Sequence, residues 1–321
     1  MNDARKITVD LEKPDIGAWR RGNRGVDYVH TIEGRDTGPH LVVNALMHGN
    51  ELSGAIAVLE LLEQPIAIAR GRLTLTFANV AAFETFDPAE PNASRFLDED
   101  MNRLWSTEAL ESADRTIEKE RARLLAPIFA EADRLVDLHS MQSFSPALTL
   151  CGLRDRGRRF ARDLGHPPLV VADAGHAGGT RLIDWGPFAD PAGPKTAILV
   201  EAGQHWARAT ADMARTCLLH ALRAAGLADA VAIEPRLPVI DAAPQRFVEV
   251  THAVTVESTA FAFDHYFEGM EVIEKAGTRI AMDGERPVTT PYDRCVLIMP
   301  SNRLDPGQTA IRVGRFVEPP A

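Results

Sequence analysis

The sequence predicts an α/β protein, with a mostly parallel, mixed central sheet flanked by helices and a smaller C-terminal β-rich domain. The first 230 or so residues alternate short apolar runs with longer helical patterns, which is typical of such a sheet. After Gly226 the sequence becomes rich in proline and then shows short runs in which apolar and polar residues alternate. The length of 321 residues accommodates two unequal domains. We therefore expect an α/β domain over residues 1–235 and a small β-rich domain over residues 236–321.

The elements of the first domain follow from apolar runs and from helical spacing. Expected strands are 41–47, 73–78, 134–139, 169–172 and 196–201. A helix is expected just after Glu51, and longer ones over 107–132 and 207–225. Residues 81–103 form a long irregular loop, a feature that is uncommon in a compact domain unless it is functional.

The second domain is expected to be antiparallel, because its apolar runs are short and alternate with polar residues. Glycines separate these runs, as turns would require. The expected strands are 254–256, 261–263, 272–273 and 295–299.

Composition limits the classes of function. The 35 basic and 45 acidic residues give a net charge of −10, which disfavours nucleic acid as a partner. No apolar run is long enough for a membrane span, and the first residues do not resemble a signal peptide. The three cysteines are far apart, with no C-x-x-C pair, so we expect a reducing, cytoplasmic compartment.

Metal-compatible side chains follow two of the expected strands. His48 and Glu51 are three residues apart where a strand passes into a helix, so they can face one cation. His139 ends another apolar strand, and ligands of an open α/β sheet bind beyond such ends. Two histidines and a glutamate are a known ligand set of catalytic zinc. Each signal alone is weak, since many helices begin with H-x-x-E and a histidine at a strand end is often structural.

Glu201 ends a third strand of mostly apolar residues. A carboxylate beside a zinc site can take a proton from water and pass it to a leaving amine. The alternative is a polar strand terminus, although glutamate is rarely buried without a partner.

The irregular loop carries Arg95, Asn102 and Arg103. Arginine binds a carboxylate through two parallel hydrogen bonds, so these residues can supply the local positive charge that an anionic substrate requires. A surface salt-bridge cluster with the preceding acidic residues is the alternative. His176, in a glycine-rich stretch, is expected to be a solvated loop residue.

Four motifs in order resemble those of the succinylglutamate desuccinylase/aspartoacylase family, part of the wider zinc carboxypeptidase-like group. They are His48-Gly49-Asn50-Glu51, Arg95 with Asp100-Met101-Asn102-Arg103, Asp137-Leu138-His139, and Glu201-Ala202-Gly203-Gln204. They span residues 48–204, about half of the chain.

The resemblance implies a hydrolase that carries one zinc ion per chain and cleaves the amide bond of a small, anionic N-acylated amino acid or a similar molecule. His48, Glu51 and His139 would be its ligands, and Glu201 the general acid/base. Arg95 would polarise the scissile carbonyl, while Asn102 and Arg103 would hold a substrate carboxylate. The second domain would close over the site.

The sequence departs from the family pattern in three ways. Met101 replaces a common leucine conservatively. No arginine lies about ten residues before Glu201, where aspartoacylases have one, and Arg181 or Lys195 are the candidate substitutes. The C-terminal tyrosine motif is also missing, and Tyr266 and Tyr292 are the tyrosines of the second domain.

The sequence alone is compatible with three other functions. They are a zinc carboxypeptidase acting on peptides, a zinc esterase and a non-catalytic metal-binding homologue. The identity of the acyl group and the amine is undetermined, and a homo-oligomer is compatible with the sequence.

Overall fold

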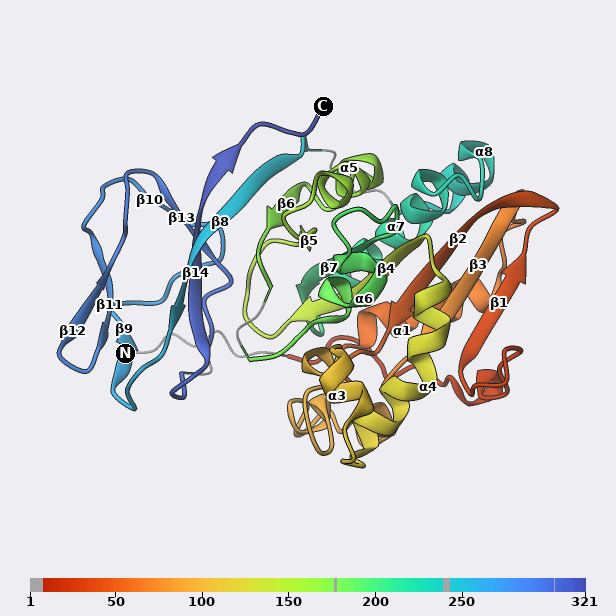
Figure 1. The fold of residues 1–321 in the computed structure, drawn as a ribbon, viewed down its shortest axis with the longest axis horizontal. Coiled ribbons are helices and arrows are strands. Elements are labelled where there is room, and N and C mark those ends of the chain that lie inside the picture. Colours follow the sequence, from red (N-terminus) through yellow and green to blue (C-terminus); the bar gives the residue numbers. More distant parts are fainter. Residues whose placement is uncertain (1–7, 176–177, 239–242, 303) are drawn as a thin grey trace.

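The computed structural model describes residues 8–175, 178–238, 243–302 and 304–321, so His176 lies outside the described residues. Its centre is an eleven-stranded mixed sheet in the order β1-β3-β2-β4-β7-β5-β6-β8-β14-β13-β10 (Figure 1). A separate three-stranded sheet has the order β12-β11-β9.

The strands of the α/β part are β1 (Val29–Glu33), β2 (Asp36–Ala45), β3 (Arg70–Phe77), β4 (Arg134–Met141), β5 (Leu148–Leu150), β6 (Leu169–Ala172) and β7 (Thr196–Gln204). Its helices are α1 (Leu52–Glu63), α2 (Val80–Glu84), α3 (Thr107–Glu111), α4 (Ile117–Glu131), α5 (Asp155–Leu164), α6 (Gly186–Ala189), α7 (Arg208–Ala224) and α8 (Ala230–Ile233). The C-terminal strands are β8 (Arg246–Thr255), β9 (Phe261–Phe263), β10 (Val272–Ile273), β11 (Arg279–Asp283), β12 (Arg286–Thr289), β13 (Cys295–Ile298) and β14 (Thr309–Val317).

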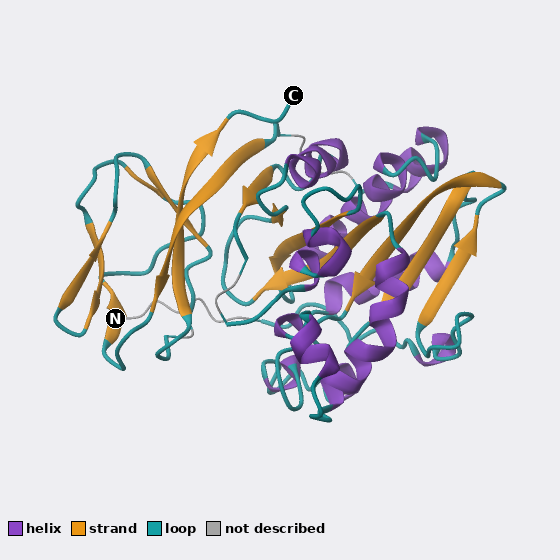
Figure 2. Cartoon of the chain, viewed as in Figure 1, coloured by secondary structure: helices purple, strands orange, loops and turns teal. Residues whose placement is uncertain are grey.

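Helices cover both faces of the α/β part of the sheet (Figure 2). Side chains alternate along the central strands, so Leu41 and Val43 of β2 belong to one buried apolar cluster and Val42 to the other. The first cluster includes the apolar faces of α1, α5 and α7, and the second includes that of α4. The four strands β3, β2, β4 and β7 are parallel, and they therefore bring their carboxyl ends to one edge.

The expected fold class is confirmed, but several elements differ in detail. The single helix expected over 107–132 is wrong, because the chain forms α3 and α4 separately. Each has its own N-cap: Ser106 Oγ accepts from the Ala109 N–H, and Thr116 Oγ1 accepts from the Lys119 N–H. The irregular loop contains α2 and the short 3₁₀ helices Ala93–Arg95 and Met101–Arg103.

The C-terminal strands divide between the two sheets. β8 pairs in parallel with β6, so β8, β14, β13 and β10 extend the central sheet. β9, β11 and β12 form the smaller antiparallel sheet, which lies farthest from the α/β helices in Figure 1. A third apolar cluster, with Phe267 and Leu297 among its members, packs this part. No helix within the described ranges has both the length and the apolar character needed to cross a bilayer.

Candidate active site

Three neighbouring segments at the carboxyl edge of the sheet bring the candidate residues together. β2 ends at Ala45, and the chain turns through Leu46, which has a φ of 59°, before it reaches His48. His139 lies near the end of β4 and is directly opposite Glu201 of β7. The parallel register of β4 and β7 therefore fixes His139 and Glu201 side by side.

His48, Glu51 and His139 form a buried group that can hold a metal ion, with one ligand atom from each lying within 4.8 Å of the others. Glu51 faces both imidazoles: its Oε1 lies 2.7 Å from His48 Nδ1 and its Oε2 lies 3.0 Å from His139 Nδ1. The three exposed fractions are only 1–2%. Nitrogen and carboxylate donors thus converge at one shielded point.

A chain of buried polar groups orients His139. Asp137 Oδ2 accepts a hydrogen bond from His139 Nε2 at 2.8 Å. Asn44 donates to the other oxygen of Asp137 at 2.7 Å, and Thr76 donates to Asn44 Oδ1 at 2.6 Å. This chain crosses β3, β2 and β4, and it turns His139 Nδ1 towards Glu51. A carboxylate behind a ligating histidine is the usual way in which such a ring is held.

The charges in the group stabilise one another. Although burial opposes it, the imidazoles of His48 and His139 hold the pKa of Glu51 well below its usual value. Although burial alone would lower it, the carboxylates of Asp137 and Glu51 raise the pKa of His139 well above 6.5. A bound cation would take the place of the imidazolium charge beside Glu51.

Glu201 has a different environment. It is 7% exposed, and its Oε2 has no hydrogen-bond partner within the described part of the chain. Burial raises the pKa of Glu201 to about 8, although the positive charge of His139 opposes the shift, and the negative charge of Glu51 adds to it. An unpaired carboxyl group whose pKa lies near neutrality is suited to proton transfer.

The loop before α3 is anchored by a single buried carboxylate. Glu118 of α4 is fully buried and accepts hydrogen bonds from the backbone N–H groups of Leu97, Asp98 and Glu99. Asn79 also donates to it, at 3.1 Å. These four bonds satisfy the charge and fix the loop segment between Arg95 and Arg103.

The side chains of this loop contact the His48, Glu51 and His139 group. Arg95 places a guanidinium nitrogen 2.8 Å from His48 Nε2 and another 3.4 Å from Glu51 Oε1. Arg103 donates to the Asn102 carbonyl at 2.7 Å, and Asn102 Oδ1 accepts from the Leu182 N–H. Although burial opposes it, His48, Arg95 and Arg103 hold the pKa of Asp100 well below its usual value. The surface salt-bridge cluster considered for this loop is thus partly buried and contacts the metal group.

One cavity of about 650 Å³ is lined by all seven candidate residues: His48, Glu51, Arg95, Asn102, Arg103, His139 and Glu201. Its other wall comes from the C-terminal part, which contributes Met299, Gln308 and Arg312 among others. A volume of this size suits a small molecule.

Several residues of the site had not been singled out from the sequence. Glu118 lies within a helical pattern and gave no signal, and Arg312 lies in a different part of the chain. His205 lines the cavity, contacts Ser140 Oγ at 2.8 Å, and has a pKa that burial lowers to about 3. Its place four residues after Glu201 was a local signal that could have been used.

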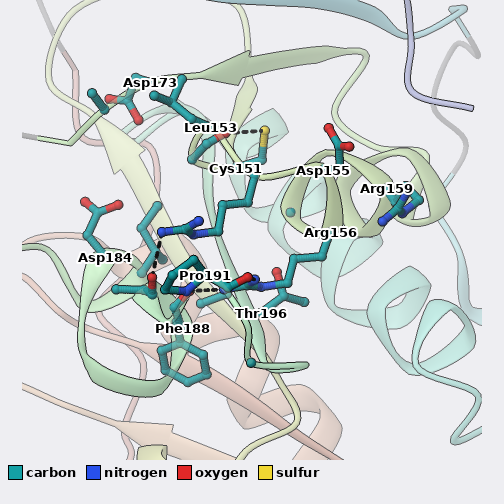
Figure 3. A pocket seen from close by; sticks show the side chains of 18 of the residues that line it. Cys151, Leu153, Asp155, Arg156, Arg159, Asp173, Asp184, Phe188, Pro191 and Thr196 are labelled. Carbon is teal, nitrogen blue, oxygen red and sulfur yellow. Dashed lines mark hydrogen bonds between the residues drawn. The ribbon is translucent and has the colours of Figure 1, made fainter.

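A second cavity, of about 950 Å³, lies between α5 and the segment before β7 (Figure 3). Asp173 and Asp184 stand on one side of it, opposite Asp155 and Arg159. Its Arg156 guanidinium donates to the carbonyls of Phe188 and Asp190, so that side chain is already engaged. This cavity is larger than the first, but none of His48, Glu51 and His139 lines it, so it is not the candidate active site.

The fold and the site together define an α/β protein with a buried His-Glu-His group at the carboxyl edge of a mixed sheet. The succinylglutamate desuccinylase/aspartoacylase catalytic domain matches residues 37–219. The chain belongs to this family, whose members are hydrolases.

Solved structures share the fold at low sequence identity. The succinylglutamate desuccinylase of Vibrio cholerae is 15% identical with a TM-score of 0.66, over 90% of this chain and 86% of that chain. That of Chromobacterium violaceum is 16% identical with a TM-score of 0.65, over 92% and 90%. The ectoine utilization protein of Ruegeria pomeroyi, solved with product bound, is 17% identical with a TM-score of 0.63, over 89% and 88%. No curated protein sequence is significantly similar to the chain.

Proposed function

We propose that this protein is a zinc-dependent deacylase that hydrolyses the amide bond of a small, anionic N-acylated amino acid. The observation that carries the proposal is the buried group of His48, Glu51 and His139 beside Glu201, whose Oε2 has no hydrogen-bond partner among the described residues. A ligand set of three with a general base beside it is what catalytic zinc requires, whereas a protein that only binds metal has no need of the base.

The donor atoms fit zinc in particular. Two imidazole nitrogens and one carboxylate suit zinc, while magnesium and calcium prefer oxygen ligands throughout. His48 Nδ1 and His139 Nδ1 both face Glu51, and Asp137 holds the second ring from behind. One zinc ion per chain would be held by these residues, where it would act as a Lewis acid and lower the pKa of water.

The remaining roles belong to the chain's own side chains. Glu201 takes a proton from the attacking water and passes it to the leaving nitrogen. Arg95 stabilises the oxygen of the scissile carbonyl as it gains negative charge, since it already contacts His48. Arg103 binds a substrate carboxylate, and Asn102 assists through its amide nitrogen because Leu182 occupies its oxygen.

The chain division proposed here is residues 1–235 for the catalytic part and 236–321 for the part that covers the cavity. Met299 and Arg312 line the cavity from the second part, which supports its role in excluding long peptides. Three free, buried cysteines are in keeping with a cytoplasmic location, which we also propose.

Metal analysis combined with a substrate panel tests this function. We expect about one zinc per chain and hydrolysis of acidic N-acyl amino acids that stops on chelation. His139→Ala should lose most of the metal, because two ligands rarely retain zinc. His252→Ala, at an exposed histidine of β8, is the matched control and should keep both metal and activity.

The same panel separates the other readings. Hydrolysis of esters alone would favour an esterase, and cleavage of peptides a carboxypeptidase. Full activity after complete removal of metal would overturn the zinc proposal.

A further inference from the structure

Arg312 reaches the candidate active site from the second part of the chain. It lies on β14, where it pairs with Ala253 of β8 and Ile298 of β13. Its side chain is 12% exposed and lines the same cavity as Arg103 and Glu201. A long cationic side chain from β14 therefore lines the substrate cavity together with the loop arginines.

The guanidinium of Arg312 makes a long ion pair with Asp173. Its Nε lies 3.6 Å from Asp173 Oδ2, which is beyond hydrogen-bond distance. Arg181 binds both oxygens of the same carboxylate, at 2.9 and 2.7 Å. Arg181 thus occupies both oxygens of Asp173, and Arg312 approaches that carboxylate without a hydrogen bond in the described part of the chain.

Arg181 and Lys195, the two candidates to replace the arginine that aspartoacylases have before the catalytic glutamate, both bind other groups of the protein. Arg181 binds Asp173 with two nitrogens and donates its Nε to Asp184 at 2.6 Å. Lys195 donates to the Ala130 carbonyl and precedes β7, six residues before Glu201. At about 3.3 Å per residue, that places it about 20 Å along the strand from the catalytic carboxyl.

The electrostatics of Arg312 point in the same direction. Burial lowers its pKa, and the positive charge of Arg181 lowers it further, while Asp173 opposes the shift. Arg103 has a similar environment: burial lowers its pKa, the negative charge of Asp100 opposes that shift, and the charges of Arg95, Arg181 and Arg312 add to it. A dianionic substrate that placed one carboxylate on each of these two guanidinium groups would relieve this repulsion.

We propose that Arg312 binds a second carboxylate of the substrate, so that the enzyme selects dianionic N-acyl amino acids. Arg103 holds one carboxylate from the loop, and Arg312 holds the other from β14. This inference rests on the proposed deacylase function. It makes the second part of the chain a contributor to specificity as well as a cover for the cavity.

The test compares Arg312→Gln with Arg315→Gln. Arg315 lies on the same strand but is exposed and stacks on Tyr292, so it is the matched control. The substrates are a dianionic N-acyl amino acid and its analogue in which one carboxylate is an amide. Arg312→Gln should raise KM about 10- to 100-fold for the diacid and leave KM for the amide analogue nearly unchanged.

A binding measurement keeps the inference testable if no deacylase activity is found. Calorimetry of the protein as isolated should show tighter binding of succinate than of butyrate, and Arg312→Gln should abolish that preference. Thermal unfolding of the variant checks that the fold is retained. Succinate preference that depends on Arg312 without any hydrolysis would reject the proposed function alone.

Three results would overturn the role of Arg312. One is an equal rise in KM for the diacid and the amide analogue. Another is an equal effect of Arg315→Gln. The third is an unchanged succinate preference in a folded Arg312→Gln protein, and deacylase activity that persisted in that case would leave the proposed function intact.

Discussion

Glu51 and Glu201 lie on the same cavity, yet their environments separate them chemically. Glu51 contacts two imidazoles and accepts a hydrogen bond from the Ser140 N–H. Burial alone would raise the pKa of Glu51, but the two imidazoles hold it well below its usual value. Glu201 Oε2 has no partner among the described residues, and burial raises its pKa to about 8. This contrast supports the assignment of one as ligand and the other as acid/base.

Substitution of Glu201 tests that assignment. Glu201→Gln removes the proton acceptor but keeps the shape, so turnover should fall by about 10² to 10⁴ while zinc stays bound. Glu249→Gln, at a half-exposed carboxylate of β8, should leave both unchanged. Loss of zinc in Glu201→Gln would identify Glu201 as a ligand, and full activity would identify it as a structural strand end.

The two loop arginines should differ in the kinetic step that they affect. Arg103→Lys keeps the charge but loses the planar fork, so KM for a carboxylate substrate should rise about 10- to 100-fold. Arg95→Lys should instead lower kcat, because its proposed partner gains charge only in the transition state. Steady-state kinetics of both variants would refute the division of roles if they changed the same constant.

At the scale of elements, strands with continuous apolar runs could be predicted from the sequence, and β2, β3, β4, β6 and β7 are found where expected. Several elements were missed, among them β1, β5 and α5 of the α/β part and β11, β12 and β14 of the C-terminal part. The first three were missed because their signals are local and weak. β5 has only three residues, β1 contains the polar pair His30-Thr31, and α5 buries few apolar side chains. These elements depend on tertiary pairing, such as that of Thr31 with Thr74, which periodicity does not encode.

The candidate site was predictable to the extent that it lies at strand ends. The alternation of strands and helices predicts a mostly parallel sheet whose strand ends share one edge. That β4 and β7 are neighbours, which places His139 opposite Glu201, is seen only in the structure. The contribution of β14 was not predictable, because no sequence rule brings Arg312 beside Glu201. Nor was the pairing of β8 with β6, since the proline-rich linker indicated a separate domain.

The polar chain across three strands has a measurable consequence for metal binding. Asp137→Asn places an amide nitrogen against either the Asn44 amide or the His139 ring, so one of two hydrogen bonds is lost. Zinc affinity should fall about 10- to 100-fold in a chelator competition assay. Thr149→Val, on β5, is the control, because its buried hydroxyl has no partner among the described residues. Equal zinc affinity in Asp137→Asn and the native protein would contradict the orienting role.

At the scale of the whole molecule, the cavity and the sheet both include the two parts of the chain. Residues Met299 and Arg312 line the cavity, and β8 covers the edge of β6. A chain that ends at residue 235 should therefore lose activity and aggregate, because it exposes the edge of β6. Solubility and size-exclusion chromatography check this outcome. A monomeric, active fragment would show that the second part contributes neither specificity nor stability.

The pairing of β6 with β8 also sets an order of events during synthesis. Leu169 pairs with Arg246, so β6 emerges from the ribosome 77 residues before the strand that covers it. A contact of such long sequence separation forms slowly, and an uncovered strand edge is a site of misassociation in the meantime. The nascent chain therefore passes through a stage in which its proposed catalytic residues are all present but its sheet is incomplete. The substrate cavity is completed only once β14 has been made, because that strand supplies Arg312.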